Sequence, residues 1–146
     1  MLQVFVNDCK YLLVDKLFTM LFFCMMDQNK TSTDFTNLTT WQKSRQLASI
    51  IYKATESFRD YTLKDQLRRA ALSIMNNIAE GYSRNSTKDT QHFFYISLAS
   101  CSEVRSMTYV MEDLDSLNKE TNDIIRLLSI ETHKMLHAFI EYLKNK

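Results

Sequence analysis

The sequence contains no proline and only one glycine in 146 residues. Tight turns between β-strands and long ordered loops depend heavily on these two residues. Their scarcity argues against a sheet-rich protein, whereas a hydrophobic content of 45% is ample for the core of one domain of this length. We therefore expect an all-α fold.

The single glycine also excludes a glycine-rich phosphate-binding loop. Cysteine is sparse, and Cys9, Cys24 and Cys101 are far apart with no Cys-x-x-Cys pair. This pattern predicts buried thiols in a reducing compartment rather than a disulfide framework. Local motif chemistry supports no Ser/His/Asp order and no Cys/His pair. We therefore expect a protein that is not an enzyme and has no cofactor.

Metal-binding patterns are weak as well. His133 and His137 have the spacing that places two ligands on one helix face, and Glu141 follows one turn later. The His-Glu-x-x-His order and any cysteine cluster are missing, so solvated side chains are the favoured interpretation. Glu80 and Glu103 lack the Glu-x-x-His repeats of bundle di-metal sites. We expect no metal.

The small net charge of +1 conceals an asymmetry along the chain. Residues 39–110 hold ten Lys/Arg against six Asp/Glu, while residues 111–146 hold five against seven. The first of these regions is therefore net +4 and the second net −2. A basic surface, if one exists, should come from the first half of the folded domain.

The N-terminal stretch, residues 1–26, is apolar but interrupted by charges, and its longest uncharged run covers only residues 17–26. A run of about ten residues is too short to span a bilayer, so we expect no membrane span. We expect residues 1–38 to be an apolar helical segment with a polar linker, and residues 39–146 to be the main domain. Translation from Met25 or Met26 is an alternative that would remove residues 1–24. The intact mass of the natively expressed protein distinguishes the two.

Apolar residues at helical spacing predict four helices in the main domain. We expect them at about 41–58, from 62 to the stretch 83–86, at 87–117 and at 124–143. Thr39 or Thr40, Thr62 and Ser86 are the expected N-caps. Short connections between amphipathic helices favour an antiparallel up-down-up-down four-helix bundle, with the N-terminal apolar segment as an extra helix.

The second helix carries two stripes. The apolar stripe predicts a core face and comprises Leu63, Leu67, Ala70, Ala71, Ile74 and Ile78. The polar stripe beside it comprises Gln66, Arg69, Ser73, Asn76, Asn77, Glu80 and Arg84. A carboxylate within the apolar arc of the third helix, Glu103, should be paired if buried, and Arg69 is the expected partner. We predict an internal polar network of Arg69, Asn77, Glu80, Ser100 and Glu103.

The third helix has two apolar strips. The core of a single bundle can cover only one of them. The expected core strip comprises Phe93, Ile96, Ser100, Val104, Met107, Met111 and Leu114. The second strip comprises Phe94, Leu98, Cys101 and Tyr109. We predict that a homo-oligomer buries the second strip between subunits. On the fourth helix, the expected inward residues are Ile124, Leu128, Met135, Phe139 and Tyr142.

Several basic residues fall on the first two helices and the start of the third. Arg68, Arg84, Lys88 and Lys43 are the candidates for contacts with nucleic-acid phosphates. A solvated charged face is the alternative interpretation, and it usually holds for scattered lysines.

The order of residues resembles the four-helix bundle protein family, also called the 23S rRNA intervening-sequence proteins. The resemblance rests on Trp41-Gln42-Lys43 and Ile51-Tyr52, on the run from Gln66 to Ala71, on Ser73-Ile74, on Asn77-Ile78-Ala79-Glu80-Gly81, and on Arg84, Phe93, Phe94, Ile96, Ser100 and Glu103. It covers about residues 35–117. Ser97 and Ala99 differ from the Ala and Gly usual in the family, and Arg59 stands where it usually has a proline.

The resemblance implies a bacterial, cytoplasmic four-helix bundle that assembles into a homopentamer. Related bundles are accessory proteins of retroelements and are thought to engage a reverse transcriptase and nucleic acid. We therefore hypothesise a non-enzymatic oligomeric bundle that is an accessory factor for RNA, DNA or a ribonucleoprotein. The alternative is a protein-interaction scaffold that binds no nucleic acid.

Overall fold

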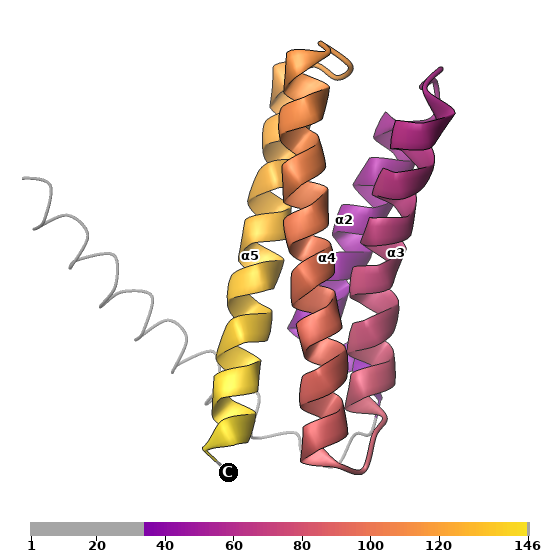
Figure 1. The fold of residues 1–146 in the computed structure, drawn as a ribbon. Helices are drawn as coiled ribbons and strands as arrows, with labels where there is room; N and C mark the ends of the chain where they lie inside the picture. Colours follow the sequence, from indigo (N-terminus) through magenta and orange to yellow (C-terminus); the bar gives the residue numbers. More distant parts are fainter. Residues whose placement is uncertain (1–33, 146) are drawn as a thin grey trace, which may run out of the picture. The chain divides into compact units, whose positions relative to one another are not determined.

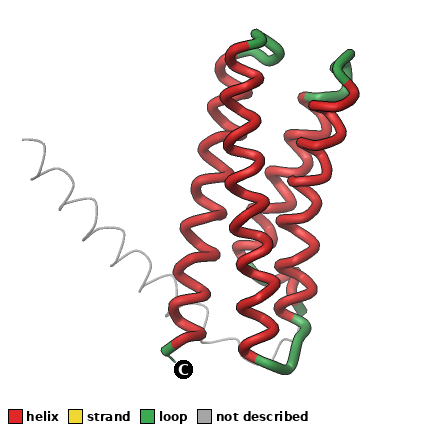
Figure 2. The backbone as a smooth tube through the Cα atoms, in the orientation of Figure 1, coloured by secondary structure: helices red, strands yellow, loops and turns green. Residues whose placement is uncertain are grey.

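Four α-helices make up nearly all of residues 34–145, the part of the chain that the computed structural model describes. They are α2 (Thr39–Ala54), α3 (Tyr61–Tyr82), α4 (Thr87–Asp113) and α5 (Lys119–Lys144), with a short 3₁₀ helix η2 (Phe35–Asn37) before α2 (Figure 1). No strand occurs in these residues (Figure 2). The all-helical fold is confirmed, whereas the predictions for residues 1–33 lie outside the described residues.

The four helices pack around one apolar core. Each helix contacts the next in the chain, and α2 also contacts α5, so the set closes into a bundle. The core side chains come from all four helices and include Leu47, Ile51, Ile74, Val104 and Ile125, each 0% exposed. Burying such side chains stabilises the fold by about 1.5–3 kcal/mol each.

Side chains cap three of the four helices. Ser86 accepts a hydrogen bond from the backbone of Asp89, which confirms the capping residue predicted for α4. Asp60 rather than Thr62 caps α3, and Asn118 caps α5, which begins at Lys119, five residues before the predicted start. The predicted cap of α2 was wrong, because its N-cap is Leu38 and no side chain bonds there.

The predicted core face of α3 is confirmed from Leu67 to Ile78, all of it buried. The prediction for α4 was only partly right, because Ser100, Val104 and Met111 are buried as expected but other positions are exchanged. Phe94, Leu98 and Cys101, expected between subunits, lie in the core of this subunit at 0%, 9% and 1% exposure, and of that strip only Tyr109 is exposed. Ile96 and Leu114, expected in the core, are 36% and 59% exposed.

Buried small polar side chains explain why the core face of α4 differs from the one predicted. Its buried positions include Thr90, Ser97 and Thr108, which were not among the expected core residues. The hydroxyls of Thr90 and Thr108 are satisfied within the helix end or turn, as when Thr108 Oγ1 donates to the carbonyl of Arg105 at 2.7 Å. On α5 a similar shift by one residue buries Ile125 and exposes Ile124, which was expected inward.

The contact between α3 and α4 is close because its residues are small. The Ser73 and Ser100 hydroxyl oxygens lie 2.8 Å apart, and Ser97 Oγ donates to the carbonyl of Ile74 at 3.1 Å. Near the end of α3, a Cβ added to Gly81 would lie 2.9 Å from Phe93 Cβ. Gly81 is therefore required for this approach.

Within residues 34–145, no helix is both long enough and apolar enough to cross a membrane.

Candidate nucleic-acid interface

Arg68, the first of the predicted phosphate contacts, lies where α2 ends against α3. Its Nε donates to Thr55 Oγ1 and its Nη2 to the carbonyl of Tyr52, both at 2.9 Å. The guanidinium also lies over the Tyr52 ring, 4.6 Å from its centroid. Arg68 thus satisfies the carbonyl of Tyr52 in the last turn of α2, where carbonyls lack partners within the helix, and bonds the hydroxyl of Thr55 just after it. Its position is fixed by the fold.

Arg84 and Lys88 lie at the junction of α3 and α4. Arg84 forms an ion pair with Glu80, one turn earlier, and its guanidinium lies 4.8 Å from the centroid of the Phe93 ring. Its side chain is still 46% exposed. Lys88, in the first turn of α4, is exposed. The structure therefore brings these two cations to one end of the bundle, as the sequence predicted.

Lys43 is distant from that junction along the chain and forms a link between helices. Its Nζ donates to Glu131 on α5 at 2.8 Å. The side chains are 36% and 52% exposed, so the pair is solvated and adds little stability. Whether any of these four basic residues binds nucleic acid stays a prediction.

The predicted internal polar network does not form within the subunit. Arg69 pairs with Asp65 on its own helix at 2.9 Å and not with Glu103. Glu80 pairs with Arg84, and both Glu80 and Glu103 are exposed. Only Asn77 and Ser100 take part in a shared contact, because both bond to the Ser73 hydroxyl. Glu103 needs no buried partner since its carboxylate is in solvent.

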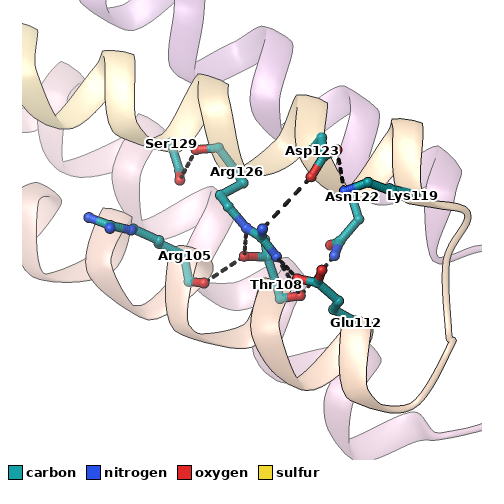
Figure 3. Close-up of polar contacts among 8 residues, drawn as sticks. All are labelled: Arg105, Thr108, Glu112, Lys119, Asn122, Asp123, Arg126 and Ser129. Carbon is teal, nitrogen blue, oxygen red and sulfur yellow. Dashed lines mark hydrogen bonds and ion pairs between the residues drawn. The ribbon is translucent and has the colours of Figure 1, made fainter.

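A polar cluster that sequence reasoning missed connects α4 and α5, centred on Arg126 (Figure 3). The Arg126 side chain is only 18% exposed. It donates to Thr108 Oγ1 at 3.0 Å, pairs with Glu112, and lies 3.7 Å from Asp123. Its guanidinium is also 4.3 Å from the centroid of the Tyr109 ring. The hydrogen bond to Glu112 raises the pKa of Arg126, so this cation is permanent.

Asn122 belongs to the same cluster and is buried, at 3% exposure. Its Nδ2 donates to the carbonyl of Thr108 at 2.8 Å (Figure 3), whereas its Oδ1 is buried without a hydrogen-bond partner. The sequence carried one signal for the cluster. Thr108 and Glu112 are four residues apart on one helix, as are Asn122 and Arg126 on the other, so each pair shares a face.

Several cations of this protein lie over aromatic rings. Residues 34–145 contain at least six such pairs, including Arg45 over Trp41, Lys64 over Tyr61 and Lys144 over Tyr95. Four of the rings, on Tyr52, Tyr61, Tyr95 and Tyr109, are also exposed. Exposed rings beside cations are the side chains that bind unpaired nucleotides.

Of the two histidines of α5, which were predicted to be solvated, only His137 fits that prediction. His137 is exposed and His133 is half-buried. Burial lowers the pKa of His133, and the nearby His137 and Arg105 lower it further. In the described part of the chain, no three His, Cys, Asp or Glu side chains gather in a way that could hold a metal ion.

Comparison with known proteins places this bundle in a family. The family model described as 23S rRNA-intervening sequence protein matches residues 36–138. The chain is also similar to a crystal structure, at 1.70 Å resolution, of a protein with unknown function from the S23 ribosomal protein family of Bacteroides thetaiotaomicron VPI-5482. That match has 24% identity and a TM-score of 0.66 over 70% of this chain and 98% of the other, so it supports the fold. No curated protein matches. The matched region spans all of α2, α3 and α4 and most of α5, and the chain belongs to the 23S rRNA-intervening sequence protein family.

Proposed function

We propose that this protein is a non-enzymatic, homo-oligomeric helical bundle that acts as an accessory factor for nucleic acid or a ribonucleoprotein. In this proposal the bundle has antiparallel up-down-up-down connections, carries an additional N-terminal helical segment, and assembles as a pentamer in the bacterial cytoplasm. A reverse transcriptase is a candidate protein partner. Membership of a family named for the 23S rRNA intervening sequence favours nucleic acid, without identifying which one.

The observation that carries the proposal is the charge at the junction of α3 and α4. Arg84 keeps 46% of its side chain exposed, and its ion pair with Glu80 leaves guanidinium donors free. Lys88 follows on the first turn of α4 and is exposed. In an oligomer the same two cations would recur once per subunit, so weak contacts with phosphates would add up.

The test is binding of RNA and DNA by the purified full-length protein at low and high salt. We expect salt-dependent retention at about 50 mM salt that disappears by about 200 mM. The double variant Arg84→Gln, Lys88→Gln should weaken binding and flatten its salt dependence. Lys53→Gln, an exposed change on α2, is the matched control. Wild-type protein that retains neither RNA nor DNA at low salt would refute the proposal.

A second candidate is a protein-interaction scaffold that binds no nucleic acid. It is favoured by a row of exposed apolar side chains on α4, in which Ile96, Val110 and Leu114 are 36%, 44% and 59% exposed. Rows of this kind mark protein contact surfaces. Co-elution of this protein with the product of the neighbouring gene, together with no retention of RNA or DNA, would favour the scaffold over the accessory factor.

A further inference from the structure

An open hollow lies along the first two turns of α3, next to its connection to α2. Its volume is about 440 Å³. The lining residues are Tyr61, Thr62, Lys64, Asp65, Gln66 and Arg68. Two cations and one aromatic ring therefore line the same surface.

The Tyr61 ring is available for stacking. Tyr61 is the first residue of α3 and is 77% exposed, the largest exposure among the large hydrophobic side chains described. Lys64, one turn later, places its Nζ 6.0 Å from the centroid of that ring. An exposed ring with a cation beside it is a platform for an unpaired base, because every base presents a π-face.

The two cations are held in place by the end of α2 but keep unused donors. Lys64 Nζ donates to the carbonyl of Glu56 at 2.8 Å, which uses one of its three hydrogens. Arg68 bonds through Nε and Nη2 to Thr55 and Tyr52, so its Nη1 hydrogens and one hydrogen on Nη2 have no role in these bonds. The acidic side chain in the hollow, Asp65, is paired with Arg69 at 2.9 Å. The hollow therefore favours an anion.

We propose that this hollow binds single-stranded nucleic acid, with a base stacked on Tyr61 and the adjoining phosphate held by Lys64 and Arg68. The inference rests on the proposed function and adds to it a strand preference and a second position on the protein. A duplex keeps its bases stacked on each other, so it offers Tyr61 no free face except at its ends. Single strands should therefore bind more tightly than duplexes.

The experiment is a fluorescence anisotropy titration of the full-length protein. The probes are a labelled 12-nucleotide RNA that cannot pair with itself, the DNA of the same sequence, and the blunt RNA duplex. Wild type should bind both single strands more tightly than the duplex. Tyr61→Ala should weaken single-strand binding about tenfold, whereas Tyr61→Phe should retain it. Lys64→Gln should lower the slope of log affinity against log salt by about 0.7.

Leu127→Ala is the control, since Leu127 is a 60% exposed apolar side chain on α5 that presents neither a ring nor a cation. It should leave the affinity unchanged. If wild type binds nucleic acid but Tyr61→Ala binds as well as wild type, or the duplex binds as tightly as the strands, this inference is overturned and the proposed function stands. If no probe binds wild type at low salt, both are overturned.

Discussion

Single residues in this protein differ greatly in how far the fold restricts them. Cys101 is 1% exposed and its thiol is in the core, whereas Tyr61, with 77% exposure, is almost fully in water. A buried residue is restricted by its packing, while an exposed one keeps its ordinary chemistry. Reactivity and titration are therefore the properties that test individual positions.

Cys101 should be unreactive in the folded protein. Burial raises the pKa of its thiol to about 12, so almost none of the thiolate nucleophile forms at neutral pH. Alkylation with iodoacetamide at pH 8, followed by peptide mass mapping, should label Cys101 only after denaturation. Rapid labelling of Cys101 in the native protein would contradict the placement of this thiol in the core.

His133 should make the protein less stable at acidic pH. Its pKa in the folded state is lowered, first by burial and then by His137 and Arg105, so the unfolded chain binds a proton more readily. The stability should therefore decline as the pH falls through about 6.5, the unfolded value, and level off below the folded pKa. His133→Gln should reduce this decline in thermal melts between pH 7.5 and 5. An undiminished decline in His133→Gln would contradict this assignment.

Each helix as an element shows why some of the fold was predictable and some was not. The core face of α3 was predicted because its buried residues from Leu67 to Ile78 are aliphatic or alanine. The core face of α4 was predicted only in part, because Ser97 and Thr108 occupy buried positions while Ile96 and Leu114 are exposed. Periodicity records side-chain polarity and not the hydrogen bonds that make a buried hydroxyl acceptable.

The candidate sites show the same limit. Cations at the junction of α3 and α4 were predictable, because Arg84 and Lys88 flank a capping serine. The Arg126 cluster was not, because it depends on how α4 and α5 face each other across 14 to 18 residues of sequence. The relative position of two helices is set by the packing of their side chains. The spacing of residues within one helix does not reveal it.

Gly81→Ala should destabilise the contact between α3 and α4. The new Cβ would lie 2.9 Å from Phe93 Cβ and 3.0 Å from the ring of Phe94, which is fully buried. Overpacking of about 1–3 kcal/mol should exceed the gain of about 1 kcal/mol in helix propensity. We expect a net loss of about 1 kcal/mol in urea denaturation. Asn76→Ala, an exposed change on the same helix, should be neutral or stabilising, and an equal gain at Gly81 would contradict the close approach.

Arg126→Ala should loosen the link between α4 and α5. The change removes hydrogen bonds to Thr108 and Glu112 and the contact with the Tyr109 ring. Glu112 is 48% exposed, so water can solvate the carboxylate that remains. We expect a loss of about 2 kcal/mol in the free energy of unfolding. Arg105→Ala, which removes an exposed arginine from α4, should cost less than about 0.5 kcal/mol, and equal effects of the two variants would argue against the cluster.

At the scale of the whole molecule, the exposed side of α4 carries large apolar side chains that a single subunit does not bury. Ile96, Val110 and Leu114 are exposed there, whereas Phe94, Leu98 and Cys101, which the sequence assigned to a subunit contact, are buried in the core. A contact between subunits through α4, as proposed, would use this other side of the helix. An assembly through this row is open to direct measurement.

The double variant Val110→Glu, Leu114→Glu should sediment as a monomer if the protein assembles through this row. Both side chains are exposed in the subunit, so the change should leave helicity unaltered. Sedimentation velocity with wild type alongside measures the change. Lys53→Glu and Ser57→Glu, exposed on and just after α2, together form the matched control. A variant as large as wild type, or a monomeric wild type, would remove this surface from the proposal.

The small residues Ser73, Ser97, Ser100 and Gly81 also restrict which substitutions the contact between α3 and α4 can accept. The two helices meet through short hydroxyl side chains and through the Gly81 backbone against Phe93, so little space is left for larger side chains. We therefore expect tolerated variation at these four positions to be confined to small residues.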